Sequence, residues 1–273
     1  MTKIASFNVN SINARLPRLL EWLKYSNPDI VCLQELKCLE EKFPFEALLD
    51  AGYNCAVSGQ KTYNGVAILS KYKIEDVVKT LPMLDSDEEQ DQQARYIEAV
   101  IAMPNQALRI ASIYVPNGGS ELLPNQKLED SAKFIYKLKF FQRLQNHLSK
   151  LLKYDEMQFF AGDFNVAIDD LDIVDPKAFA MQILFHPHER QAMRSILNLG
   201  LSDSYRLCNQ GKKEFSWWDY RGNCYEKNYG ARIDYILLSA QALDKLACAE
   251  IENVNVRDQE KASDHCPVVV NIL

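Results

Sequence analysis

The 273-residue chain is 47% hydrophobic, enough to bury a large core, and it carries a formal net charge of −6 at neutral pH. This acidic balance excludes a general nucleic-acid coat protein, which needs lysine and arginine over most of its surface. No stretch is long and apolar enough to span a bilayer, and the opening MTKIASFNVNS lacks the apolar region of a signal peptide. We therefore expect a soluble, cytoplasmic protein, and we expect a monomer because no feature indicates oligomerisation.

Short apolar runs rich in β-branched and aromatic residues predict strands along the whole chain. These runs cover residues 3–9, 29–34, 65–69, 96–101, 108–115, 158–162, 232–238 and 267–272. Apolar residues at helical spacing predict three helices, the first ending before Pro28. The helical patterns lie around residues 16–23, 134–152 and 188–197.

Strands outnumber helices, and many neighbouring strands are close enough in sequence for antiparallel hairpins. This pattern favours an α/β fold, a four-layer α/β sandwich of two packed mixed β-sheets flanked by helices. No repeat or Pro/Gly-rich linker divides the chain, so we expect one domain over residues 1–273. The seven cysteines are scattered, odd in number and never spaced as Cys-x-x-Cys, which predicts free thiols.

Charged residues cluster in two places. The acidic run over residues 85–91 is expected to be a solvated loop. Lys212, Lys213 and the stretch 221–232 are locally basic, which leaves a face that can contact DNA and makes Arg221 a candidate substrate-binding residue.

Acids and amides directly follow the first two predicted strands. Asn8 and Asn10 can both be turn or N-cap residues before the first helix. For Asn8, the alternative is a contact to a metal or a phosphate. Glu35 ends a strand that is expected to be buried, where a carboxylate is costly unless it is paired or bound to a cation. Hard ions such as Mg²⁺ prefer carboxylate oxygen, so Glu35 is either a metal ligand or an ordinary exposed strand-end residue.

Two later strands end in the same way. Asp163 and Asn165 alternate onto one face if the chain stays extended, and Gly162 permits close backbone approach. In this pair the acid could orient water as a base, and the neutral amide could donate a hydrogen bond to a phosphate. The alternative is an Asp/Asn turn after the strand. Tyr114 and Asn117 end another strand, and Tyr114 is alternatively a core residue.

An adjacent Asp264-His265 pair precedes the last strand. Imidazole handles protons or binds phosphate near neutral pH. Asp234 lies within an apolar strand, where an unpaired carboxylate is expensive, and pairing with His265 would satisfy it and fix the imidazole tautomer. The other histidines are expected to be structural or surface residues: His147, His186 and His188.

Taken in order, these segments resemble the exonuclease III family of abasic-site (AP) endonucleases, within the endonuclease/exonuclease/phosphatase superfamily. The matching motifs run from residue 6 to residue 268 and are SFNVNSINAR, LQELK, IYVPNGG, GDFNVA, SWWDYR, RIDYIL and SDHCPV. The resemblance implies a four-layer sandwich with a cleft at one end of the sheets. It also implies DNA base-excision repair: metal-dependent hydrolysis of the phosphodiester 5′ to abasic sites, with 3′-to-5′ exonuclease and 3′-end-trimming activity on double-stranded DNA.

The resemblance further implies roles for single residues. Glu35 would hold Mg²⁺, with Mn²⁺ as a substitute, and the further candidate ligands are Asn8, Asp163, Asn165 and Asp264. Asp163 would orient and deprotonate the attacking water. His265, paired with Asp234, would contact the scissile phosphate, and its oxygens would be positioned by Asn165, Tyr114 and Asn117.

In the family, the region SWWDYRGNCYEKNYGARIDY forms a pocket for a flipped-out sugar that lacks its base. The matching wall positions are Trp217, Ala231 and Ile233, although tandem tryptophans on a strand are alternatively core residues. Ala231 replaces a larger apolar residue that relatives often carry, which predicts a more open and less selective pocket. Asn10 stands where some relatives have an Asp near the metal, and the long segment 118–133 is expected to modulate DNA grip or access to 3′ ends.

Two alternatives remain open from the sequence. One is another phosphodiesterase or phosphatase of the superfamily, such as an inositol-phosphate phosphatase or a sphingomyelinase, but WWDYR and RIDYIL before SDHCP favour DNA repair. The other is a non-catalytic DNA-binding or scaffold protein, which the presence of Glu35, Asp163, Asp234 and His265 disfavours. The expected partner is double-stranded DNA with abasic sites or blocked 3′ ends, which would place the protein at the nucleoid.

Overall fold

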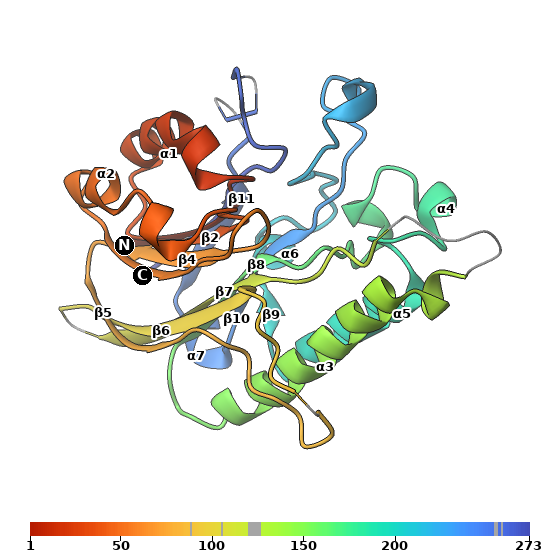
Figure 1. Cartoon of the computed structure of the whole chain (residues 1–273), viewed down its shortest axis with the longest axis horizontal. Coiled ribbons are helices and arrows are strands. Elements are labelled where there is room, and N and C mark those ends of the chain that lie inside the picture. Colours follow the sequence, from red (N-terminus) through yellow and green to blue (C-terminus); the bar gives the residue numbers. More distant parts are fainter. Residues whose placement is uncertain (88, 105, 120–126, 254–255, 258) are drawn as a thin grey trace.

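Two six-stranded mixed β-sheets pack face to face, and helices cover their outer faces (Figure 1). The structure is a computed structural model that describes residues 1–273 except 88, 105, 120–126, 254–255 and 258. A continuous layer of apolar side chains from both sheets fills the space between them. This arrangement confirms the fold class that the strand pattern predicts.

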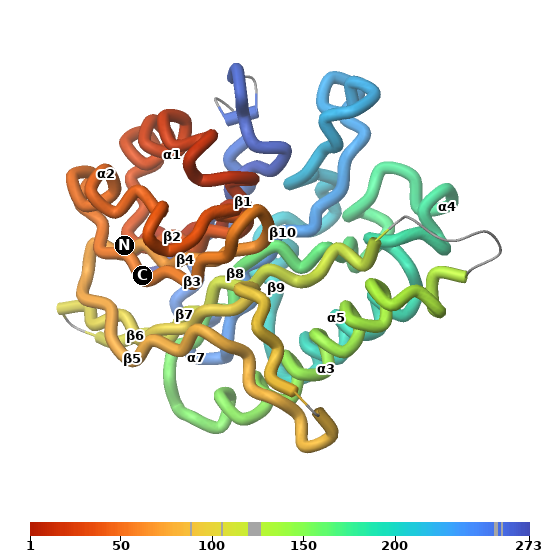
Figure 2. Tube along the Cα trace, in the orientation of Figure 1, coloured from red at the N-terminus to blue at the C-terminus, as the bar shows by residue number. Residues whose placement is uncertain are grey.

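The first sheet has the strand order β11-β12-β1-β2-β4-β3. Its strands are β1 (Thr2–Asn8), β2 (Ile30–Gln34), β3 (Asn54–Ser58), β4 (Val66–Ser70), β11 (Leu246–Ile251) and β12 (Val268–Ile272). β1 runs parallel to β2 and antiparallel to β12, so the two ends of the chain lie side by side (Figure 2). The outer face is covered by α1 (Ile12–Ser26) and α2 (Phe45–Asp50).

The second sheet has the strand order β5-β6-β7-β8-β10-β9. Its strands are β5 (Lys73–Val78), β6 (Tyr96–Ala102), β7 (Ala107–Tyr114), β8 (Gln158–Asp163), β9 (Ser202–Asp203) and β10 (Asp234–Leu238). Its outer face is covered by α3 (Ala132–Leu151) and α5 (Pro187–Leu197).

Short helical segments complete the connections between these elements. The α-helical ones are α4 (Pro176–Phe179), α6 (Ser204–Cys208) and α7 (Ala240–Leu243). Turns of 3₁₀ helix lie at Glu40–Lys42, Leu128–Asp130, Asp170–Asp172 and Arg221–Asn223. Within the described part of the chain, no helix combines the length and the apolar character needed to cross a membrane.

All eight strands and all three helices predicted from the sequence are present, with strand ends shifted by one or two residues. The four strands that the sequence does not predict, β3, β5, β9 and β11, are the four edge strands of the two sheets. An edge strand is covered less completely than a central one, so four of the six residues of β5 and three of the six residues of β11 are exposed. Cys32 and Cys38 are buried free thiols, as expected.

The prediction of a solvated acidic loop over residues 85–91 is wrong for two of its acids. The Asp87 carboxylate has no exposed surface and lies 2.6 Å from the Arg143 Nε of α3. Asp91 lies 3.2 Å from the Arg143 Nη1 and accepts a hydrogen bond of 2.6 Å from the Tyr136 hydroxyl. Asp87 and Asp91 are therefore held against α3 by their ion pairs with the buried Arg143.

Candidate active site

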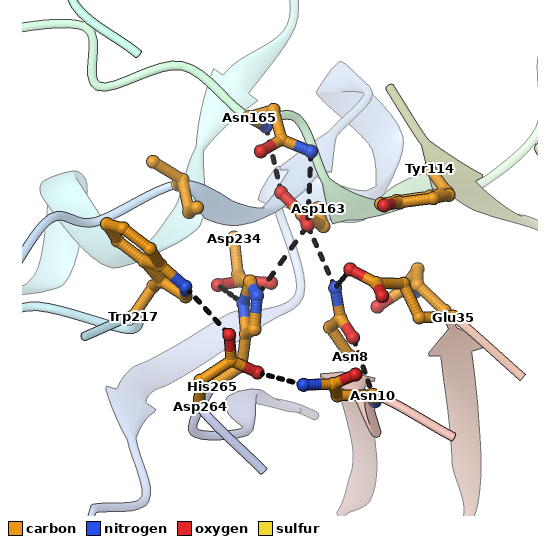
Figure 3. Close-up of polar contacts among 12 residues, drawn as sticks. Asn8, Asn10, Glu35, Tyr114, Asp163, Asn165, Trp217, Asp234, Asp264 and His265 are labelled. Carbon is orange, nitrogen blue, oxygen red and sulfur yellow. Dashed lines mark hydrogen bonds and ion pairs between the residues drawn. The ribbon is translucent and has the colours of Figure 1, made fainter. Parts of the chain in front are cut away.

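Polar side chains from several strands meet at one end of the two sheets (Figure 3). The parallel pair β1–β2 ends with Asn8 beside Gln34, and the parallel pair β7–β8 ends with Tyr114 beside Asp163. The antiparallel strand β10 begins at the same end, with Asp234 opposite Asp163. Pairing and register therefore bring together residues that lie far apart in the sequence.

His265 and Asp234 form a buried pair, as the cost of an isolated carboxylate in an apolar strand predicts. The His265 Nδ1 lies 2.9 Å from the Asp234 Oδ2, and the Ser216 hydroxyl donates a 2.6 Å hydrogen bond to the same oxygen. Burial alone would lower the pKa of His265, but the charges of Asp234 and Asp163 raise it above the ordinary imidazole value. A cationic imidazole is therefore held at the end of the sheets.

Asp163 lies at the centre of the group. Its Oδ1 accepts a hydrogen bond from the Asn165 backbone N–H at 2.8 Å, and its Oδ2 accepts one from the Asn8 Nδ2 at 2.9 Å. The His265 Nε2 lies 3.8 Å from that Oδ2. Burial raises the pKa of Asp163, His265 opposes this effect, and the charges of Asp234 and Glu35 add to it. A raised pKa makes this carboxylate a stronger base than an ordinary aspartate.

Asp163 and Asn165 are expected to share a face only if the chain stays extended, and the structure shows the alternative, a turn. Asn165 has a left-handed backbone with φ of 51°, so the chain turns immediately after β8. The Asn165 Nδ2 nevertheless lies 3.3 Å from the Asp163 Oδ2, and it donates to the Val115 carbonyl at 2.9 Å. The turn therefore still brings the Asn165 amide to the Asp163 carboxylate, and the Asp163 side chain stabilises the turn by accepting from the Asn165 backbone N–H.

Glu35 approaches Asp163 from β2 through a shared amide. The Asn8 Nδ2 donates to the Glu35 Oε1 at 2.9 Å as well as to Asp163, and the Lys37 Nζ lies 2.7 Å from the Glu35 Oε2. Burial would raise the pKa of Glu35, but Lys37 and Asn8 outweigh it and lower that pKa. The carboxylate is therefore ionised and already sits against one cation.

Three ligand atoms at this end of the sheets, from Glu35, Asp163 and His265, lie within 4.8 Å of one another. Two of the three are carboxylate oxygens, which suits a hard divalent ion such as Mg²⁺. Asp264 lies at the margin, because its Oδ1 accepts from the Asn10 Nδ2 at 2.8 Å and its Oδ2 from the Trp217 Nε1 at 3.1 Å. The residues present therefore fit a divalent cation, with the Glu35 and Asp163 carboxylates as its candidate oxygen ligands.

A cavity of about 260 Å³ opens over these residues and is called the catalytic cavity below. It is lined by Glu35, Tyr114, Asn117, Asp163, Asn165, Leu184, Trp217, Asp219, Arg221, Ile233, Asp264 and His265. Ten of the site residues singled out from the sequence thus meet in one place. Asn8 and Asp234 are buried behind them, and Ala231 lines an adjoining cavity.

Tyr114 and Asn117 complete the wall on the β7 side. The Asn117 Nδ2 lies 3.4 Å from the Asn165 Oδ1, so the two amides stand together. The Tyr114 ring lies 4.7 Å from the Arg95 guanidinium, and burial with the charges of Glu35 and Asp163 raises the pKa of its hydroxyl. Tyr114 is therefore a neutral hydrogen-bond donor at neutral pH. The predicted role of segment 118–133 falls largely on residues 120–126, which lie outside the described residues.

The tandem tryptophans do not lie on a strand, contrary to expectation. Trp217 makes only isolated bridges, to Ala231 and to His265, whereas Trp218 is a core residue that is 2% exposed. Trp217 lines the catalytic cavity, whereas Trp218 packs in an apolar cluster with Phe215 and Cys266.

The sequence analysis does not single out Lys137, which the structure places directly beneath the site. Its Nζ is fully buried on α3 and donates to the backbone carbonyls of Asn165 at 2.7 Å and Asn117 at 3.2 Å. It also forms an ion pair with the buried Glu189 carboxylate of α5. The sequence does contain a feature that indicates its burial, because Lys137 lies on the apolar face of its helix, three residues after Phe134.

A second buried ion cluster, also missed, lies behind the wall of the site. The Asp172 Oδ1 accepts hydrogen bonds from the Arg232 Nε at 2.8 Å and from the Arg206 Nη2 at 2.5 Å. Arg232 directly follows Ala231, so this cluster fixes the backbone that forms the cavity wall.

Comparison with known proteins places this geometry in context. Residues 5–265 match the endonuclease/exonuclease/phosphatase family. The chain is 32% identical to exodeoxyribonuclease III of Haemophilus influenzae, across 97% of this chain and 98% of that protein. The fold matches a 3′ phosphatase from Neisseria bound to a product DNA hairpin, with a TM-score of 0.90 and 36% identity over 100% of both chains. It also matches an AP endonuclease from Archaeoglobus fulgidus, with a TM-score of 0.89 and 35% identity over 100% of this chain and 99% of that one.

Proposed function

Because the chain belongs to the endonuclease/exonuclease/phosphatase family, we propose that it is a DNA-repair nuclease that breaks the bond between phosphorus and a 3′ oxygen. This single reaction covers cleavage 5′ to an abasic site, stepwise 3′-to-5′ nucleotide removal and release of a 3′-terminal phosphate. The observation that carries the proposal is the arrangement of Asp163 beside the Asp234–His265 pair in the catalytic cavity.

Asp163 is the base in this proposal. Its raised pKa and its central position support its taking a proton from the attacking water, while the amides of Asn8 and Asn165 hold the carboxylate in place. As the water oxygen bonds to phosphorus, the bond to the 3′ oxygen breaks and that oxygen takes up a proton.

His265 is the cationic donor to the phosphate. Asp234 holds the imidazole by its Nδ1, which leaves the Nε2 directed toward the catalytic cavity. Donors that are already oriented stabilise the negative charge that develops on the phosphate oxygens without having to reorganise. The amides of Asn117 and Asn165 and the hydroxyl of Tyr114 supply neutral donors on the opposite side.

Glu35, with Asn8 and Asp264 nearby, would hold Mg²⁺ or Mn²⁺, and Asp163 and Asn165 border the same position. A divalent ion bound there supplies positive charge opposite the developing phosphate charge. The Lys37 Nζ lies 2.7 Å from the Glu35 Oε2 and also donates to the Asn10 Oδ1, so it holds the Glu35 carboxylate in place.

The substrate is double-stranded DNA with abasic sites or blocked 3′ ends, acted on by one monomeric domain over residues 1–273. Arg221 is 90% exposed and lines the catalytic cavity, where it can contact a backbone phosphate. Trp217 and Ile233 form the apolar part of the wall against which an extruded sugar would rest.

One gel assay tests the proposal. An end-labelled duplex with a single abasic-site analogue, a duplex with a recessed 3′ end and a duplex with a 3′-phosphate are each incubated with Mg²⁺ and then with a chelator. We expect metal-dependent incision on the 5′ side of the lesion and metal-dependent removal of terminal groups. Failure to cleave any of the three duplexes in the presence of Mg²⁺ contradicts the proposal.

A further inference from the structure

Arg95 lies next to Tyr114, which lines the catalytic cavity. β6 and β7 pair antiparallel with Tyr96 opposite Ile113, so the register sets Arg95 beside Tyr114 just beyond the start of β6. The Tyr114 backbone N–H donates to the Arg95 carbonyl at 2.8 Å, and the Arg95 Nη1 donates to the Tyr114 carbonyl at 3.4 Å. The two residues are therefore joined through both backbone groups of Tyr114.

The Arg95 guanidinium also lies over the Tyr114 ring. Its central carbon is 4.7 Å from the ring centroid, within the range at which the face of an aromatic ring attracts a cation. The Tyr114 side chain is buried, and its hydroxyl points toward the Glu35 and Asp163 carboxylates (Figure 3). The guanidinium therefore holds the ring of a phenol whose hydroxyl faces the site.

Contacts from the neighbouring chain and from α3 hold the Arg95 guanidinium in place. The Arg95 Nε donates to the Gln93 Oε1 at 2.8 Å, and the same oxygen accepts from the Asn64 Nδ2 at 3.1 Å. The Tyr136 ring of α3 lies 5.9 Å from the guanidinium, and the Tyr136 hydroxyl donates to the Asp91 Oδ2 at 2.6 Å. The position of the guanidinium over the Tyr114 ring is therefore set by the fold before any substrate binds.

The positive charge of Arg95 is not neutralised by a carboxylate. Among the residues that the structure describes, the Arg95 side chain donates to an amide and a carbonyl oxygen and forms no ion pair. Arg143 and Arg232, by contrast, each pair with a buried acid. A cation that keeps its charge over the face of a phenol draws electron density from the ring, which makes the hydroxyl a stronger hydrogen-bond donor.

We propose that Arg95 is a positioning residue: it holds the Tyr114 ring and polarises its hydroxyl, so that this hydroxyl donates to a phosphate oxygen as negative charge develops there. The inference rests on the proposed function and adds a residue that acts without touching the substrate. A donor that is already oriented stabilises the transition state without having to reorganise. The effect should appear in kcat, because the hydroxyl interacts less strongly with the less charged ground state.

Steady-state rates with Mg²⁺ on a duplex that ends in a 3′-phosphate test this role. Arg95→Met keeps much of the side-chain volume but removes the charge, so kcat should fall about tenfold while KM stays within about twofold. Arg95→Lys keeps the charge but lacks the planar guanidinium, and kcat should fall only about threefold. Equal losses of kcat in the two variants overturn the proposal. A rise in KM with unchanged kcat also overturns it, because Arg95 would then contact the DNA itself.

A double-mutant cycle with Tyr114→Phe shows whether Arg95 acts through the Tyr114 hydroxyl. Tyr114→Phe keeps the ring but removes the donor, so adding Arg95→Met should change kcat by less than about twofold. A further tenfold loss in the double variant overturns the proposal, because Arg95 would then act by another route. Arg190→Met is the matched control: the Arg190 guanidinium lies 4.1 Å from the Phe185 ring, and neither residue lines the catalytic cavity. This control should leave kcat within about twofold.

A surface variant serves if Arg95→Met fails to fold. Gln93 is exposed, so Gln93→Leu should keep the fold while removing the acceptor of the Arg95 Nε. We expect kcat to fall about threefold in the protein that carries Tyr114 and to stay unchanged in the Tyr114→Phe background. No fall in the first case, or an equal fall in both, overturns the positioning role alone. Failure of the wild-type protein to cleave any duplex overturns the proposed function instead.

Discussion

Replacing Lys137 by methionine tests how the interior of the protein supports the site. Methionine fills a similar volume but removes the ammonium group that donates to the Asn117 and Asn165 carbonyls and pairs with Glu189. The Glu189 carboxylate, which has no exposed surface, would keep one donor, the His186 backbone N–H at 3.1 Å. Two carbonyl oxygens at the base of the site would lose a donor at the same time.

The expected cost follows from this burial. Burial already lowers the pKa of Lys137 and raises that of Glu189, so neither charge is well solvated without the other. Removing one partner of such a pair costs about 3–5 kcal/mol of unfolding free energy, because the remaining charge is uncompensated. Adding Glu189→Gln removes that charge but keeps an acceptor for His186, and should restore about 2 kcal/mol.

Activity should respond differently from stability. Neither Lys137→Met nor the double variant restores the donor to the Asn117 and Asn165 carbonyls, so both variants should lose about tenfold or more in kcat, with a smaller change in KM. Urea unfolding at pH 7 measures stability, and removal of a 3′-phosphate measures kcat. Lys150→Met, at an exposed position in the last turn of α3, is the control and should stay within about 0.5 kcal/mol.

Two results refute this reasoning. A loss below about 1 kcal/mol for Lys137→Met would mean that the buried pair is not the energetic unit that its burial indicates. A double variant that recovers kcat together with stability would mean that Lys137 supports the fold without positioning the two amides.

Three further predictions concern single carboxylates. Asp163→Asn should lower turnover by orders of magnitude in a protein with an unchanged circular dichroism spectrum, and near-normal turnover would remove Asp163 from the mechanism. Burial by itself lowers the pKa of His265, but the charge of Asp234 raises that pKa by more than burial lowers it. Activity that needs the imidazolium is therefore lost only as the pH rises through this raised pKa. Asp234→Asn should move the alkaline limb of the pH–rate profile down toward roughly 6.5, and an unmoved limb contradicts the assignment. The pKa of Asp172 is raised by burial but lowered overall by Arg232 and Arg206, so its stabilising effect is present above its unfolded value of roughly 3.9 and is lost as pH falls through the folded value. The stability gap between wild type and Asp172→Asn should therefore be widest at pH 7 and narrow below about pH 4, and a constant gap in urea unfolding from pH 7 to pH 3 would contradict it.

The sequence by itself determines the central strands and the partners that their polar residues require. Strands such as β2 and β8 are buried on both faces, so they read as unbroken apolar runs. An acid placed in such a run must have a partner, and this requirement alone predicts the contact between Asp234 and His265. The edge strands cannot be predicted from apolar runs, because strands that face solvent do not need an apolar sequence.

Only the tertiary structure decides which distant groups meet and what space they leave. Lys137 and Glu189 are 52 residues apart, and no local pattern links them until α3 and α5 pack on the same sheet. Likewise, Asn8 joins Glu35 to Asp163 because β1 and β8 end at the same place in facing sheets. The cavity that adjoins the catalytic cavity also depends on packing, since its wall at Ala231 is formed by two backbone hydrogen bonds to Trp217, 14 residues earlier in the chain.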